Sequence, residues 1–111
     1  MIKIVPLSED DILFDEEAAG KALEKAARRL KPVRFTGLCP IGRQILFVFN
    51  ECSAEEDDSG ARFVFSKLPS RNFDEVSATF LSRFIGGYDT LGTFSIGDDL
   101  WGLFKRLPQN A

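Results

Sequence analysis

The 111-residue sequence contains no histidine and only two cysteines. Without histidine, the chain lacks the most common general base and the most common zinc ligand. Cys39 and Cys52 do not form a Cys-x-x-Cys motif, so we expect neither a structural zinc site nor a dithiol redox centre, and no other metal or cofactor. Two cysteines are also too few for a disulfide scaffold. We therefore expect two reduced thiols, with Cys39 as a small buried hydrophobic side chain.

Long apolar segments and an excess of positive charge are also missing. Apolar runs such as residues 45–49 are much shorter than the roughly 20 residues that span a bilayer. The N-terminus lacks the basic start, long apolar centre and cleavage site of a secretory peptide, so we expect a cytoplasmic protein without membrane contact. The net charge of −3 argues against a general nucleic-acid-binding protein. Binding of nucleic acid is a minor alternative, which is suggested by one basic cluster: Arg28, Arg29, Lys31 and Arg34.

The feature that organises the sequence is an internal repeat. Residues 37–49 align with residues 92–104 without a gap, and two glycines, one isoleucine and one phenylalanine are identical in both copies. At another offset, residues 3–16 align with residues 62–75. We therefore predict one domain over residues 1–111. It consists of a first repeat at residues 1–50, an acidic linker at residues 51–60 and a second repeat at residues 61–107.

The hydrophobic pattern predicts the same elements in both repeats. Alternating or β-branched stretches predict strands at residues 1–7, 33–41, 44–50, 61–66, 90–96 and 100–106. Asp15 is placed to cap the first helix and Phe14 to staple its first turn, and residues 73–75 repeat this start. Pro32 follows the end of the first helix, and Gly86-Gly87 ends the second.

These elements predict an α+β fold built from tandem βαββ repeats. The simplest arrangement is one mostly antiparallel six-stranded sheet with both helices on one face, analogous to ferredoxin-like folds. Each half also resembles small bacterial βαββ domains of unknown function, whose hydrophobic last strand ends in Phe-Lys-Arg, here residues 104–106. This resemblance implies the fold and no particular activity.

Alternation along the strands divides the predicted sheet into two faces. The residues expected under the helices are Ile4, Phe35, Cys39, Phe63, Phe65, Phe94 and Ile96. Two helices are too few to cover both faces of six strands, so we predict an interaction surface on the helix-free face. Its residues are Trp101, Leu103, Leu46, Val48, Arg34 and Arg62. The alternative is that strand twist and the linker bury these residues within the monomer.

Two acidic segments supply further candidate contacts. Residues 55–58 have no apolar side chain to bury and lack the alternating ligand spacing of an EF-hand, so we expect a solvated linker rather than a calcium site. Residues 97–99 lie where the first repeat has Gly42-Arg43, which favours a hairpin turn over a metal site. The acidic candidates for contact with a partner are Glu55, Glu56, Asp57, Asp58, Asp98 and Asp99.

These patterns favour a small non-enzymatic binding or interaction domain that acts through the helix-free face, as a homodimer or on another protein. Its acidic charge would suit an inhibitor or immunity-type partner of a basic target. The alternative is a domain that senses a small molecule or catalyses a reaction in a pocket between the two repeats. In that case Arg34, Arg62 and Trp101 would converge on the pocket.

Overall fold

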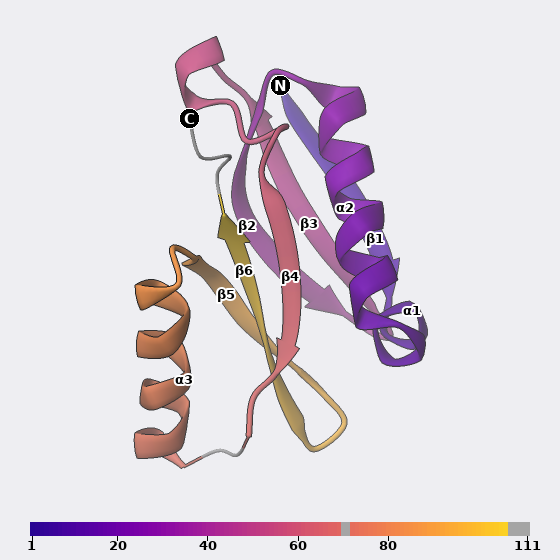
Figure 1. Ribbon diagram of the computed structural model, residues 1–111. Coiled ribbons are helices and arrows are strands. Elements are labelled where there is room, and N and C mark those ends of the chain that lie inside the picture. The colour runs from indigo at the N-terminus through magenta and orange to yellow at the C-terminus, as the bar shows by residue number, and fades with distance from the viewer. Residues whose placement is uncertain (70–71, 107–111) are drawn as a thin grey trace.

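A computed structural model describes residues 1–69 and 72–106 of the chain (Figure 1). The first repeat contains β1 (Ile2–Ser8), α1 (Glu9–Phe14), α2 (Glu16–Leu30), β2 (Val33–Ile41) and β3 (Gln44–Glu51). A short 3₁₀ helix, η1 (Ala54–Glu56), precedes the second repeat, which contains β4 (Arg62–Lys67), α3 (Phe73–Ile85), β5 (Asp89–Ile96) and β6 (Asp99–Arg106). The predicted α+β class is therefore confirmed, and the two halves are similar and β-rich, although the first half contains two helices where one was predicted.

The six strands form two separate antiparallel sheets, so the prediction of a single six-stranded sheet is wrong. The first sheet has the order β1-β3-β2 and the second has the order β4-β6-β5. The sheets pack face to face, with ring centroids 5.6 Å apart for Phe47 and Phe65 and 6.2 Å apart for Phe49 and Phe63. The central strands β3 and β6 are apolar on both sides. A single six-stranded sheet would leave the apolar side chains on its helix-free face exposed, whereas stacking the two sheets buries part of them.

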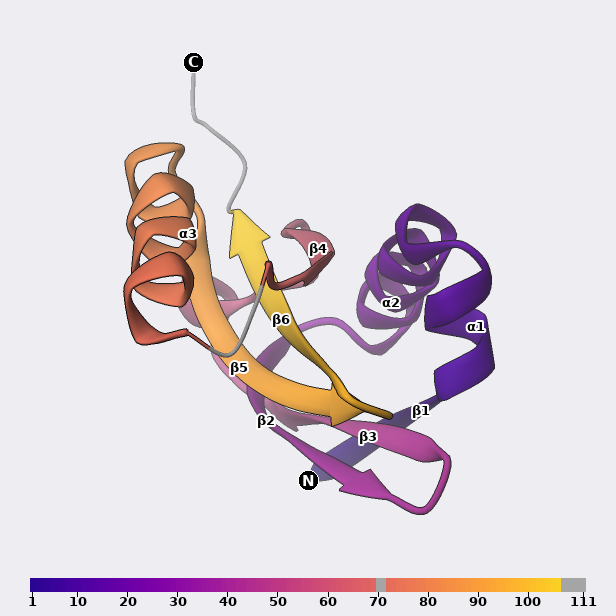
Figure 2. The same ribbon diagram turned by 90° about the horizontal axis from the view of Figure 1, so that it is seen from below.

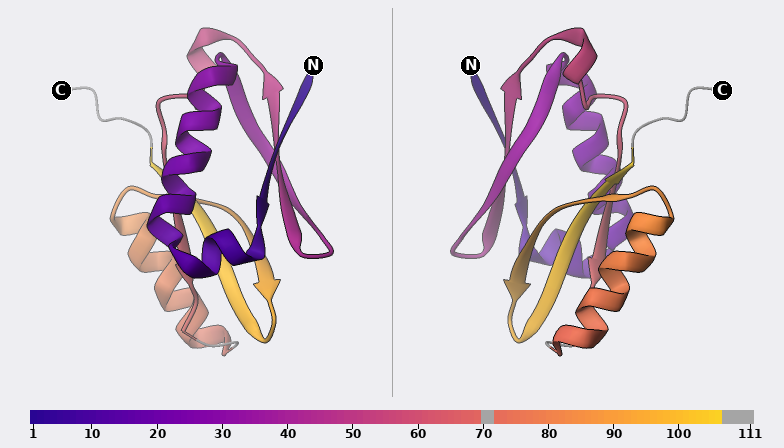
Figure 3. Two further views of the ribbon diagram at one scale, coloured as in Figure 1. Left: turned by 90° about the vertical axis from the view of Figure 1, so that its right-hand side faces the viewer. Right: turned by 90° about the vertical axis from the view of Figure 1, so that its left-hand side faces the viewer.

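The helices and sheets are arranged in layers (Figure 2). α2 and the second sheet together cover one face of the first sheet, and α3 covers the far face of the second sheet, where Phe80 contacts Phe104 at 6.0 Å between ring centroids. The helix-free face of the second sheet is thus buried against the first sheet. The helix-free face of the first sheet has no described helix or strand over it (Figure 3).

This layering explains which predicted core residues are buried. Four of them are buried as predicted, but between the sheets rather than under α3: Phe63, Phe65, Phe94 and Ile96. Phe35 is buried on the helix-covered side of the first sheet. Ile4 and Cys39 lie on the helix-free face of the first sheet and are exposed, so their prediction as core residues is wrong. No second sheet covers that face.

The predicted N-terminal cap is correct for α2 but not for α3. Asp15 caps α2 as expected, because its carboxylate accepts a hydrogen bond from the amide of Ala18 at 3.1 Å. The expected staple is wrong, since Phe14 is 91% exposed. In α3 the capping side chain is Asn72 rather than Asp74, and its oxygen accepts hydrogen bonds from the first-turn amides. The helix begins slightly earlier than the alignment of the repeats implied.

The predicted elements did not include one helix, α1. Ser8 caps it, with the hydroxyl accepting a hydrogen bond from the amide of Asp11 at 3.1 Å, and acidic residues fill its first turn. A serine followed by acids is a common signal for a helix start, and it was present in the sequence. The helix is six residues long, too short for its apolar spacing to be recognised.

The predicted turns are confirmed by their backbone geometry. Gly42 and Gly97 each begin a two-residue hairpin loop and have φ of 60°. After α3, Gly87 has φ of 85°, and the amide of Tyr88 donates to the carbonyl of Arg83 at 2.9 Å. This is the glycine cap that the sequence predicted.

The two repeats approach each other closely where α2 lies along the free edge of β4. A Cβ atom at Gly20 would be 2.5 Å from the carbonyl oxygen of Phe63. One turn later, the carboxylate of Glu24 accepts a hydrogen bond from the amide of Phe63 at 3.0 Å. Helix α2 therefore supplies a hydrogen-bond partner to an edge strand that has no neighbouring strand on this side.

Replacing Gly20 with alanine should lower the free energy of unfolding by about 1–3 kcal/mol, the usual range for overpacking. Helix propensity alone would favour alanine by about 1 kcal/mol, so a loss would report the contact with Phe63. Urea denaturation measures the change. Gly37→Ala is the control, because no atom lies within 4 Å of its added Cβ, and it should stay within about 0.5 kcal/mol of wild type. A gain in stability at Gly20 would contradict the close approach.

Candidate functional site

The helix-free face of the first sheet is an apolar surface, which we call the open face. Its residues are Ile2, Ile4, Pro6, Cys39, Ile41, Leu46 and Val48, placed together by strand register. Ile2, Ile4 and Ile41 are 63%, 55% and 59% exposed, and Leu46 and Val48 are half-buried. None of the seven is charged. An apolar patch on a sheet face commonly marks a contact with another molecule.

Polar groups surround the open face. Gln44 lies on the same side at one end of β3 and Asn50 at the other, where its amide nitrogen donates to the hydroxyl of Thr36 at 3.3 Å. Arg34, beside Asn50 in the register, pairs with Glu56 at 3.7 Å. The surface therefore has an apolar centre and a polar rim, as protein–protein interfaces do.

The structure separates the six residues predicted for the interaction surface. Leu46 and Val48 belong to the open face and Arg34 to its rim. Trp101 is only 5% exposed and Leu103 is fully buried, because they lie on the corresponding face of the second sheet, which packs against the first. The prediction is wrong for these two, and the alternative of burial within the monomer is correct for them.

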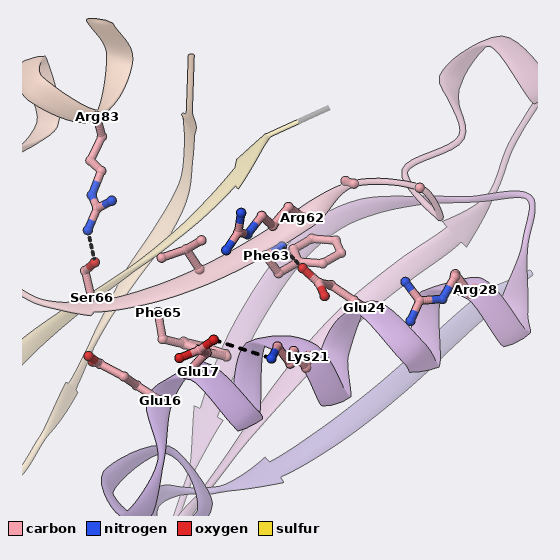
Figure 4. Close-up of a pocket in the computed structure, with 13 residues that line it drawn as sticks. Glu16, Glu17, Lys21, Glu24, Arg28, Arg62, Phe63, Phe65, Ser66 and Arg83 are labelled. Atoms are coloured by element: carbon pink, nitrogen blue, oxygen red, sulfur yellow. Dashed lines mark hydrogen bonds and ion pairs between the residues drawn. The ribbon is translucent and has the colours of Figure 1, made fainter. Parts of the chain in front are cut away.

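Arg62 is exposed but lies elsewhere, in a groove between the repeats. The groove has a volume of about 510 Å³, with β4 as its floor and α2 and α3 as its walls (Figure 4). Arg34 and Trp101 do not line it, so the predicted convergence of the three residues is wrong. Hydrogen bonds and ion pairs join several of its groups: Glu17 with Lys21 at 3.4 Å, and Arg83 with Ser66 at 2.6 Å.

The acidic segment after β3 has a structural role that the sequence did not reveal. The amide of Asp58 donates to the carbonyl of Val33 at 2.7 Å, and the amide of Val33 donates to Asp57 at 2.9 Å. The carboxylate of Asp58 also accepts a hydrogen bond from the amide of Phe35 at 2.8 Å. These bonds occupy the edge of β2 as a neighbouring strand would. A 2.8 Å ion pair from Asp58 to Lys105 then joins this edge to β6.

The prediction that residues 55–58 form a solvated linker is therefore wrong for Asp57 and Asp58. Asp58 is 3% exposed, so it is not available to a partner. The exposed members of the acidic set are Glu55, Glu56, Asp98 and Asp99, and Asp99 pairs with Lys67 at 3.4 Å. The sequence does not distinguish Asp58 from the three acidic residues before it. What buries Asp58 is its contact with Lys105, which lies 47 residues away in the chain.

Two ionisable groups in this region have shifted pKa values. Burial by itself would raise the pKa of Asp57, but hydrogen bonds from the Ser59 hydroxyl and from the amides of Val33 and Ser59, with Lys31 nearby, lower it overall. Burial raises the pKa of the Cys52 thiol, and the neighbouring carboxylates raise it further. Cys52 is thus poorly suited to act as a thiolate nucleophile.

Residues 1–69 and 72–106 contain no group of three or more acidic or cysteine side chains arranged to hold a metal ion. No helix in those ranges has the length and apolar character to cross a membrane. The chain matches no protein-family model, no curated protein and no solved structure. The resemblance of each half to small bacterial βαββ domains stays a prediction.

Replacing Asp58 with alanine should destabilise the fold by about 3–5 kcal/mol, because it leaves the half-buried Lys105 without its counter-charge and the buried amide of Phe35 without an acceptor. Urea denaturation of the variant measures the loss. Glu55→Ala, from the same acidic segment but exposed, should change stability by no more than about 0.5 kcal/mol. Equal stability of the two variants would show that the ion pair does not hold the sheets together.

The lowered pKa of Asp57 predicts a pH-dependent contribution to stability. Because the folded-state pKa lies below that of the unfolded chain, the contribution is present above about pH 4 and is lost as the pH falls through the folded-state value. The difference in unfolding free energy between wild type and Asp57→Asn should therefore be constant near neutral pH and shrink below about pH 4. Urea denaturation across this pH range measures it. A difference that stays constant into strong acid would contradict the assigned hydrogen bonds.

Proposed function

We propose that this protein is a non-enzymatic interaction domain whose open face binds a second copy of the same chain. The observation that carries the proposal is the concentration of exposed large hydrophobic side chains on one uncharged sheet face. Ile2, Ile4 and Ile41 are more than half exposed there, beside the half-buried Leu46 and Val48. Burial of such a surface is the main favourable term in protein association.

The second repeat supports this proposal by analogy within the chain. The open-face residues Cys39, Ile41, Leu46 and Val48 align in the repeat with Phe94, Ile96, Trp101 and Leu103. The latter four are buried, because the first sheet covers them. The same side of a βαββ unit is thus already a sheet-packing surface in one half of the molecule. In the other half it has the matching apolar positions without a cover.

The charge distribution favours a second copy as the occupant. Two identical uncharged faces can pack about a twofold axis without burying a charge or placing like charges in contact. The rim residues Gln44, Asn50 and Arg34 would then surround the apolar centre at the edge of the interface.

The strand edge of β1 favours face-to-face stacking over extension of the sheet. The amide of Glu51 donates to the carbonyl of Met1, and that of Glu9 donates to the carbonyl of Arg43, so odd-numbered residues of β1 bond to β3. Pro6, an even-numbered residue, therefore lies where its missing N–H would face the free edge. A proline in this position discourages another strand from pairing there.

A small ligand in the groove between α2, β4 and α3 is the alternative function. Its position between the two repeats, with Arg62 and Arg83 on its surface, favours it. The pairs of Glu17 with Lys21 and of Arg83 with Ser66 weaken it, because a ligand would have to compete with them.

The test compares the association of wild type with that of Ile4→Lys by light scattering over a range of concentrations. Ile4 is 55% exposed, so the substitution should leave the fold intact while placing a charge in the interface. The dissociation constant of the dimer should rise tenfold or more, which corresponds to about 1.4 kcal/mol.

Leu81→Lys is the matched control, since Leu81 is 60% exposed on α3 and outside the open face. It should associate as wild type does. A wild type that is monomeric at every concentration would overturn the proposed self-association. So would an equal loss of association in both variants.

A further inference from the structure

A second apolar surface lies in the corner between α1 and α2. It is a hollow of about 590 Å³ whose apolar wall includes Leu7, Phe14, Ala18 and Ala22. We call it the acidic hollow, because aspartate residues form its rim. Ala18 and Ala22 are four residues apart and so lie on one side of α2, where their small side chains leave room. None of the lining residues belongs to the open face.

Phe14 gives this hollow an exposed aromatic side chain. Its side chain is 91% exposed, and that of Leu13 beside it is 53% exposed. A solvated phenylalanine ring beside a hollow of small apolar residues is a ready contact for an apolar side chain of another molecule.

The rim of the hollow is negatively charged. Asp10, Asp11 and Asp15 line it and are exposed. No lysine or arginine lines the hollow, and none in the described ranges forms an ion pair with these three carboxylates. Their charge is therefore available to a cationic partner.

We propose that the acidic hollow docks a basic amphipathic segment of another protein. An apolar side chain of that segment would pack on Phe14, Ala18 and Ala22, and its lysine or arginine residues would meet Asp10 and Asp11. Both parts of this recognition are required, because apolar contact supplies most of the affinity and opposite charge sets orientation and the rate of encounter.

Helix α2 of a second copy is basic, but it does not combine exposed basic and exposed apolar side chains as the proposed partner would. Lys21, Lys25 and Arg28 are on the exposed side of α2, while Leu23 and Ala27 on its apolar side are buried in the core. A folded second copy would therefore offer the charges without the apolar side chain. The acidic rim also repels anionic lipid surfaces, so the occupant is a protein segment.

The experiment measures binding of a fluorescein-labelled synthetic helical peptide of leucine and lysine by fluorescence anisotropy, at low and at physiological salt. Phe14→Ser should weaken binding at least fivefold, and Asp10→Asn with Asp11→Asn should do the same. A peptide with glutamate in place of lysine should bind at least tenfold more weakly than the lysine peptide. Urea denaturation should show unchanged folding, because all three side chains are exposed.

Two controls separate this site from non-specific attraction and from the open face. Leu81→Ala with Asp74→Asn removes an exposed apolar side chain and one negative charge on α3, and it should bind the peptide as wild type does. Ile4→Lys should also retain binding, so loss of self-association and loss of peptide binding are distinguishable. Equal binding by all variants, equal weakening by the α3 control, or equal binding of the glutamate peptide would overturn the proposal.

Discussion

The packing of the second sheet on the first decides the position of nearly every other element. Phe47 and Phe49 of the first sheet meet Phe65 and Phe63 of the second, in a layer that contains most of the core. The contact joins the helix-covered face of one sheet to the helix-free face of the other. Two similar repeats therefore form an asymmetric molecule, in which one helix-free face is buried and the other is open to solvent.

Polar and close backbone contacts complete this packing at the sheet edges, where unpaired backbone groups would otherwise remain. Asp57 and Asp58 bond to β2 in place of a strand, and Lys105 of the second sheet neutralises Asp58. On the other side, α2 approaches β4 at Gly20 and bonds to it through Glu24. The ion pair of Lys105 with Asp58 and the contacts of α2 with β4 connect the second repeat to the rest of the chain, so the stability of each half depends on the other.

The asymmetry also places the two proposed binding surfaces on the first repeat. The open face is apolar with a polar rim, whereas the acidic hollow combines the exposed ring of Phe14 with carboxylates. The two surfaces differ in chemistry and would select different partners: a copy of the chain on one, and a basic segment of another protein on the other. A domain of this kind can link self-association to the binding of a second protein without any catalytic group.

Local sequence determined the elements, because strand alternation, helix capping and turn glycines act over a few residues. All six strands lie within one residue of their predicted bounds, and Asp15, Gly42 and Gly97 have their predicted roles. Which faces pack together was decided only by tertiary structure. Leu46 and Trp101 occupy equivalent, apolar positions, and only the stacking of the sheets leaves one accessible and buries the other. Likewise, Asp58 differs from its acidic neighbours only because folding brings Lys105 to it.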